Sequence, residues 1–265
     1  MPHRSPTLLV GVYAFDAESL KKKWSLLHWA DREPLPEDAG VVQAWVHFHN
    51  GEFKRATEMG LKAGGDGITV ANKATCIHAN HLQHLGHARP ELFLQAAERA
   101  EAQQAREPEN ANAWYWQGYA LGRYSQSISV TKALAQGLGS KVKAALEHTI
   151  TLAPRHAAAH LALAAFHAEV IDKVGTLVGC LAYGAKKDTA LMLFRQALQL
   201  NPSSAIVKTE YARGLLMLEG DKQLKEAMRL CEQAAACEPW DAMEQLDVQR
   251  AKTLVVSMAK REFQA

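Results

Sequence analysis

The stretch ALMLFRQALQLNP, residues 190–202, shows the residue spacing on which the fold of this chain depends. Small or apolar residues stand at positions 190, 194 and 197, and a proline follows at position 202. Residues three and four apart share one face of an α-helix, so this spacing predicts a buried stripe on a helix that ends before the proline. The same spacing recurs in two further segments, Val142-Leu146-Thr149-Pro154 and Ala227-Cys231-Ala234-Pro239.

Four prolines stand in matching surroundings, at intervals of 46, 48 and 37 residues. An alanine follows each proline three residues later; the pairs are Pro108 and Ala111, Pro154 and Ala157, Pro202 and Ala205, and Pro239 and Ala242. Proline fits the turn between two helices because it fixes φ and lacks an N–H group. A helix end, a turn and a helix start that recur in this way predict an all-α solenoid of antiparallel helix pairs.

The composition limits the class of protein. The chain has 265 residues, of which 48% are hydrophobic, enough for a sizeable core. Its 30 basic and 28 acidic residues leave a net charge of +2, which gives no sign of a nucleic-acid partner. The four cysteines form no CxxC pair, so neither a zinc framework nor a disulfide framework is predicted. Free thiols favour a cytoplasmic location. The longest apolar run, residues 174–185, is too short for a membrane span.

Three segments resemble the tetratricopeptide repeat (TPR). AWYWQGYAL, residues 113–121, resembles the first helix of a repeat unit, and Ala190, Phe194 and Pro202 resemble the second half. HNGEFKRATEMGLKAG, residues 49–64, resembles the turn and second helix. The resemblance implies a single TPR-like domain over residues 1–265. We expect a leading helix within residues 16–36, about five repeat units over residues 37–239 and a capping helix over residues 241–263.

Two central units are longer than the repeat requires. The extra residues centre on GRYSQSISVTKALAQGLG, residues 122–139, and EVIDKVGTLVGCLAYG, residues 169–184. We expect them to elongate the helices of these units, a layout similar to that of the regulator of microtubule dynamics group and its bacterial relatives. The apolar side chains of the second insert are expected to pack against the first. A partner- or lipid-facing patch and a homodimer interface through residues 170–185 are the alternatives.

In TPR proteins the first helix of each unit lines a concave groove. The resemblance places seven residues on this face: Trp45, His49, Tyr115, Tyr119, Arg123, Glu169 and Arg213. Aromatic and arginine side chains are typical binding anchors. We therefore expect a non-catalytic scaffold that binds a peptide or protein partner in the groove. The alternative is an accessory protein that holds a small molecule or lipid between the long insert helices. Lys73 and Asn112 match part of a chaperone-binding clamp, but the full set is missing.

Four histidines, His78, His81, His84 and His87, recur at every third residue of CIHANHLQHLGH, residues 76–87. Each step of three turns a helix by about 300°, so these side chains spread around the helix and do not grip one ion. We therefore predict no metal site. If neighbouring helices brought three histidines together, the candidate metal ligands would be His47, His78 and His81. Serine, histidine and aspartate occur in no nucleophile motif, and the glycine-rich stretches lack the order of a phosphate loop. Neither catalysis nor a cofactor is expected.

Overall fold

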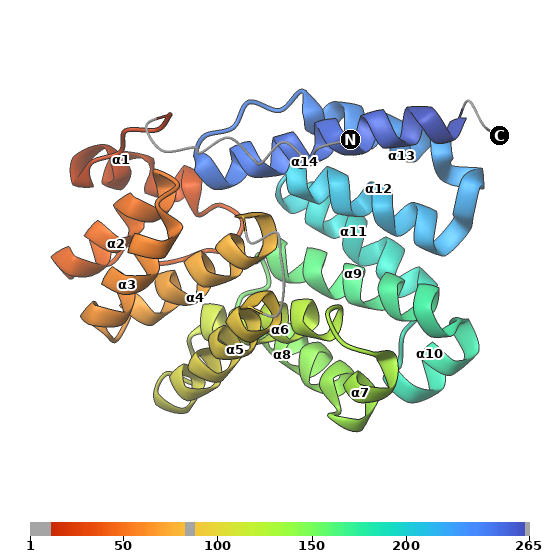
Figure 1. The fold of residues 1–265 in the computed structure, drawn as a ribbon, viewed down its shortest axis with the longest axis horizontal. Helices are drawn as coiled ribbons and strands as arrows, with labels where there is room; N and C mark the ends of the chain where they lie inside the picture. Colours follow the sequence, from red (N-terminus) through yellow and green to blue (C-terminus); the bar gives the residue numbers. More distant parts are fainter. Residues whose placement is uncertain (1–11, 83–87, 263–265) are drawn as a thin grey trace.

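The computed structural model describes residues 12–82 and 88–262, so His84 and His87 lie outside the described residues. This part of the chain is helical and contains no strand. Most of it forms antiparallel helix pairs (Figure 1). The pairs are α2 (Ala39–His49) with α3 (Phe53–Ala63), α4 (Gly67–Ile77) with α5 (Ala88–Arg106), α6 (Ala111–Ser125) with α8 (Leu138–Leu152), α9 (Ala157–Val174) with α11 (Lys187–Leu200), and α12 (Ala205–Glu219) with α13 (Leu224–Ala235).

Single helices stand before and after the pairs. The first is α1 (Ala17–Leu27) and the last is α14 (Ala242–Glu262). A π-helical turn, His78–Leu82, extends α4, and a 3-10 turn, Gly220–Gln223, leads into α13. Side-chain caps fix several helix starts, because their oxygens accept hydrogen bonds from N–H groups that have no partner within the helix. Such caps are Asp16, Asp38, Asn110, Ser129 and Ser204.

The stripe of residues 190, 194 and 197 is buried between the helices of neighbouring pairs. Phe194 is 1% exposed, and its ring packs directly over Gly214 of α12. A Cβ atom at Gly214 would lie 2.3 Å from this ring, so α11 and α12 approach as closely as a glycine allows. Gly118 allows the same approach of Leu146 between α6 and α8. The residues that recur at this spacing in the sequence are therefore core residues of the fold.

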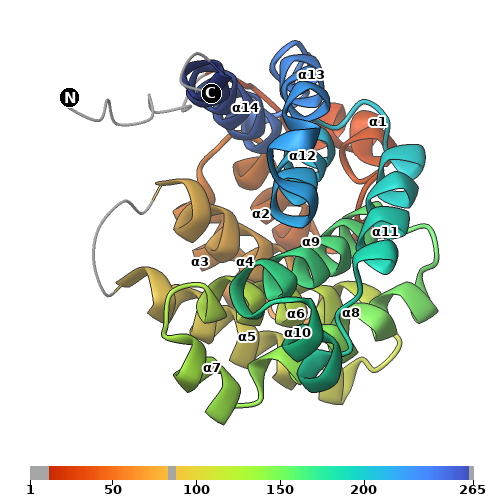
Figure 2. The ribbon, with the colours of Figure 1, turned by 90° about the vertical axis from the view of Figure 1, so that its right-hand side faces the viewer.

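The two inserts form short helices of their own. They are α7 (Val130–Ala135) and α10 (Thr176–Tyr183), which lie at the same end of the molecule (Figure 2). Tyr183 packs against Gly139, which joins the two inserts. Ile171 is buried as expected, whereas Leu177 and Leu181 are 73% and 80% exposed and Val178 is also exposed, so the expected packing is wrong for these three residues of α10.

The chain that follows α1 crosses the inner side of the solenoid. We call residues 28–36 the crossing segment. The backbone oxygen of Ala30 accepts a hydrogen bond from the N–H of Ala158, and the backbone oxygen of Asp31 accepts one from Asn112. The indole of Trp29 donates to the backbone oxygen of Leu200. The crossing segment thus contacts helix starts and ends that are far away in the sequence.

The last helix begins beside the first two helices, next to this segment (Figure 1). The start of α14 lies next to α1 and α2 (Figure 1), and Tyr13 donates a hydrogen bond to Gln245 at 3.4 Å. The inner side of the solenoid is therefore bordered by helices from both ends. None of the described helices is both long enough and apolar enough to span a lipid bilayer.

Candidate functional site

A cavity of about 640 Å³ lies on the inner side of the solenoid. We call it the concave pocket. Its walls come from α4, α6, α9, α12 and α14, from the end of α1 and from the crossing segment. Binding sites for small ligands and short chain segments commonly have volumes of about 300–1,000 Å³. The pocket is therefore large enough to enclose a ligand or a few residues of a partner.

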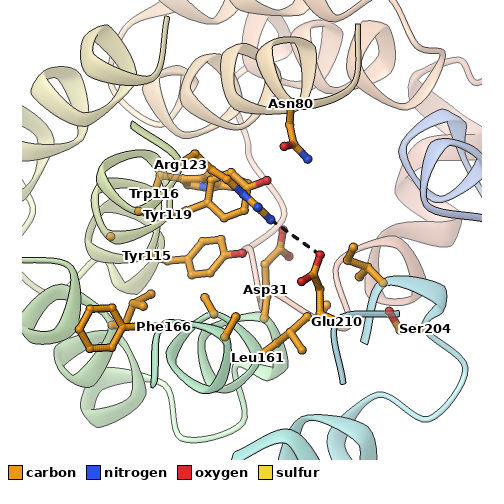
Figure 3. A pocket seen from close by; sticks show the side chains of 18 of the residues that line it. Asp31, Asn80, Tyr115, Trp116, Tyr119, Arg123, Leu161, Phe166, Ser204 and Glu210 are labelled. Carbon is orange, nitrogen blue, oxygen red and sulfur yellow. Dashed lines mark ion pairs between the residues drawn. The ribbon is translucent and has the colours of Figure 1, made fainter. Parts of the chain in front are cut away.

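One face of α6 supplies the polar side of the pocket. Tyr115, Tyr119 and Arg123 follow each other at intervals of four residues, so they point in one direction (Figure 3). The guanidinium carbon of Arg123 lies 5.2 Å from the centre of the Tyr119 ring, within the range of a cation–π contact. Burial raises the pKa of both tyrosines, so both hydroxyl groups remain protonated hydrogen-bond donors.

Three arginines surround the buried carboxylate of Glu210 in α12. Arg213 and Arg250 contact it at 2.7 and 2.9 Å, whereas the Nη2 atom of Arg123 lies 4.0 Å away. Burial alone would raise the pKa of Glu210, but the arginines outweigh burial and lower it. Arg123 is the most loosely paired of the three, and it lines the pocket. Its guanidinium retains donors for a ligand.

The facing wall is apolar. Leu161, Ala162, Ala165 and Phe166 line it from α9, with Ile206 of α12 beside them. In Figure 3 Leu161 and Phe166 lie across the pocket from the polar side chains of α6. A ligand that fits both walls therefore combines hydrogen-bonding groups with apolar surface.

The first turns of α14 supply a third, acidic wall. Trp240, Glu244 and Asp247 line the pocket there, and Asp247 is only 5% exposed. Burial, with a smaller effect of Asp241, raises the pKa of Glu244 to about 7. Burial is also the main reason why the pKa of Asp247 rises to about 8. Both groups therefore titrate close to neutral pH.

A chain of buried hydrogen bonds runs behind the acidic wall. Asp241 bonds to Nδ1 of His49 at 2.6 Å, and Nε2 of His49 lies 3.3 Å from Nε2 of His28. Nδ1 of His28 contacts Asp31 at 3.0 Å, and Lys73 donates to Asp31 at 2.6 Å. We call these five residues the buried chain. It ties α14 to α2, α1 and α4 through the crossing segment.

The structure gathers four of the seven predicted groove residues at the pocket: Tyr115, Tyr119, Arg123 and Glu169. Trp45 and His49 differ from the prediction, because both are fully buried in the core between α1, α2 and α14. The crossing segment and α1 cover the part of α2 that an open solenoid would expose. Arg213 also lies off the pocket lining, where it pairs with Glu210.

The three histidines considered for metal binding lie apart. Nδ1 of His47 contacts Glu52 at 2.9 Å, and His78 is half-buried at the start of the π turn. His81 faces the concave pocket, where burial lowers its pKa to about 3, so its ring is neutral. Within the described residues, no three His, Cys, Asp or Glu side chains converge as a metal site would require.

Sequence reasoning missed several pocket residues, among them Asp31, Glu210 and Asp247. Each comes from an element that the sequence does not connect with α6. A signal was available for two of them, since Glu210 and Asp247 occupy buried positions of helices where apolar residues are usual. Asp31 carried no such signal, because it lies in the crossing segment outside any helix.

Comparison with known proteins supports the architecture. No protein-family model matches the chain, and no curated protein matches it. The chain is similar to the crystal structure of a thermophilic TPR protein in Thermus thermophilus, with a TM-score of 0.58 and 16% sequence identity. The similarity covers 81% of this chain and 97% of that one. The fold is TPR-like. At this identity the likeness concerns the fold alone.

Proposed function

We propose that this protein is a non-catalytic, cytoplasmic scaffold that captures a short segment of a partner protein in the concave pocket. The supporting observation is the pocket itself, in which Tyr115, Tyr119 and Arg123 face the apolar wall of α9. A peptide offers both kinds of surface, because its backbone carbonyl groups accept hydrogen bonds and its side chains bury apolar area. TPR-like solenoids present such preformed concave surfaces to partners.

Arg123 is the anchor that we expect to contribute most. Arginine is enriched among the residues that dominate binding energy, and its planar group binds carbonyl or carboxylate oxygens through several donors. Nη1 of Arg123 donates to Gln126 at 3.2 Å, and the 4.0 Å pairing of Nη2 with Glu210 is loose, so its other donors are open to a ligand. Tyr119 supports the same site, because its ring lies beside the guanidinium.

A small molecule or lipid is the second candidate. The pocket reaches apolar residues of both inserts, among them Val130, Ala133 and Val174. An elongated apolar ligand would follow this direction, whereas a peptide would remain nearer to Arg123. The two candidates therefore predict different sensitive residues within one cavity.

Affinity capture from the native lysate tests the proposal with three forms of the protein. These are the wild type, the double variant Tyr119→Ala/Arg123→Gln, and Arg229→Gln, which changes an exposed arginine of α13. We expect a partner that binds the wild type and Arg229→Gln but is lost from the double variant at unchanged helicity. Equal capture by all three forms would contradict the proposal. A small molecule that co-purifies with the wild type and is visible in native mass spectra would favour the second candidate.

A further inference from the structure

Asp247 is a buried carboxyl group that faces the concave pocket without a hydrogen bond from any described residue. The ring of His81 is the nearest partner, at 3.6 Å from the carboxyl oxygen, and this ring is neutral. Arg250 lies one turn further along α14, but its guanidinium contacts Glu210 at 2.9 Å. An unpaired buried carboxyl group is costly, so its position at a cavity points to a ligand group that pairs with it.

The neighbouring cations make their closest contacts with other acidic groups. Lys73 contacts Asp31 at 2.6 Å, and Arg213 contacts Glu210 at 2.7 Å. Asp247, by contrast, has a second acid beside it, because Glu244 lies three residues earlier on the same helix and lines the same pocket. This wall therefore presents two carboxyl groups to the pocket, and no ion pair of a described lysine or arginine reaches either of them.

Apolar surface stands beside the two acids. Trp240 and Met243 line the pocket from the start of α14, and Ile77 lines it from α4. Lysine and arginine side chains bury their methylene stems on such surface while their charged ends reach a carboxylate. The half-exposed ring of Trp240 already has one cation, the Lys23 ammonium, at 5.9 Å from its centre, which shows that this ring suits a positive group.

We propose that Asp247, together with Glu244, receives a cationic side chain, an alkylammonium or guanidinium group, from the segment that occupies the concave pocket. This inference rests on the proposed function and adds the chemistry of the partner. The partner segment carries a lysine or arginine that reaches the α14 wall while its backbone and apolar groups contact α6 and α9. A free polyamine offers the same chemistry from another source.

Binding of a cation at this site is coupled to proton release. The free carboxyl groups hold protons near neutral pH, because the pKa of Asp247 is about 8 and that of Glu244 about 7. A cation favours the ionised form, so binding releases roughly one proton at pH 7 and tightens as pH rises from 6 to 8. His81 does not titrate in this range, Asp241, Glu210 and Lys73 have partners within the protein, and the arginines stay charged throughout it.

The test begins with peptides selected from a random display library on the wild-type protein. We expect a lysine or arginine at one fixed position. Replacing that residue by norleucine keeps the stem and removes the charge, and it should weaken binding to the wild type by about tenfold or more. Asp247→Asn should abolish this difference and the proton release measured by calorimetry in two buffers. Asp172→Asn, at an exposed site on α9, is the matched control and should change neither.

The outcomes separate the inference from the function on which it rests. Selected peptides without a basic residue, or an equal norleucine effect in wild type and Asp247→Asn, would overturn the inference and leave the scaffold function standing. Failure to select any peptide on the wild type would overturn the scaffold function. Spermidine is the second probe. If it binds the wild type but not Asp247→Asn while no peptide is selected, the cation site stands with a free amine as its source, and the peptide form of the inference is rejected.

Discussion

The Nε2 atoms of His28 and His49 face each other at 3.3 Å, and each ring already uses its Nδ1 atom for a carboxylate. In two neutral rings with protons on Nδ1, both Nε2 atoms would be acceptors, so the contact requires one more proton. Lys73 neutralises Asp31 at one end of the buried chain, and the His49 ring contacts Asp241 at the other end. Burial lowers the pKa of His28 to about 4, in keeping with a neutral acceptor.

Breaking the buried chain is expected to destabilise the whole protein. His49→Leu leaves Asp241 and His28 buried without their partner, which should cost about 3–5 kcal/mol in the free energy of unfolding. Urea denaturation measures this change. The control is His148→Gln, at a half-buried ring that packs on Trp114, with an expected cost below about 1 kcal/mol. Similar costs for both variants would show that the chain is not a special stabilising element.

The free energy of unfolding should fall as pH rises from acidic to neutral values, because of Glu33. Burial, reinforced by the charge of Asp31, raises the pKa of Glu33 from 4.5 to about 8. The folded protein therefore holds a proton that the unfolded chain has lost, and stability declines as pH rises from about 5 towards 8. Glu33→Gln removes this titration, so relative to wild type it should gain about 2 kcal/mol between pH 6 and pH 8. A constant difference across this range would contradict the prediction.

Two glycines within helices should respond in opposite directions to the same substitution. Gly214→Ala places a methyl group 2.3 Å from the ring of Phe194, so the core must shift at a cost of about 1–3 kcal/mol. At Gly122 the nearest atom, in Val142, is 3.9 Å away, so Gly122→Ala should stabilise α6 by about 0.5–1 kcal/mol. Thermal melts of the two variants check the difference. Equal shifts would show that α11 and α12 do not approach so closely.

The exposed leucines of α10 should contribute little to the stability of a single chain. Leu177→Ala/Leu181→Ala is expected to change the free energy of unfolding by less than about 0.5 kcal/mol. The buried Leu146→Ala should cost about 2–5 kcal/mol. Denaturation at several protein concentrations tests whether α10 instead forms an interface between copies of the chain. A cost at α10 that grows with concentration would identify this face as an interface between copies.

The repeat could be predicted because its signal is local. Ala190, Phe194 and Ala197 lie within two helical turns, and burial of one stripe fixes both the helix and its partner. The same holds for Tyr115, Tyr119 and Arg123, which share a face of α6 wherever that helix lies. The form of the second insert was harder to predict. Gly175 and Gly184, both with positive φ, lie at the two ends of α10 and separate it from α9 and α11, so the insert forms its own helix instead of lengthening its neighbours.

The closure of the site could not be predicted from spacing. Whether His49 meets Asp241 depends on how far the solenoid turns over its full length. That turn is the sum of small rotations between successive pairs, and no single segment encodes it. Trp45 and His49 were therefore assigned to an open groove, whereas the crossing segment places them in the core.

The hydrogen bond between His49 and Asp241 joins residues 192 positions apart. In an ordinary repeat array each unit touches only its neighbours, so the array can gain or lose units one at a time. Here the buried His49 of the first repeat lacks its partner Asp241 until the start of the final helix has been synthesised. Folding during translation can thus build the separate pairs, but the last step waits for the end of the chain. Once joined, the first and last helices lose their native contacts together, and the protein should unfold as one cooperative unit.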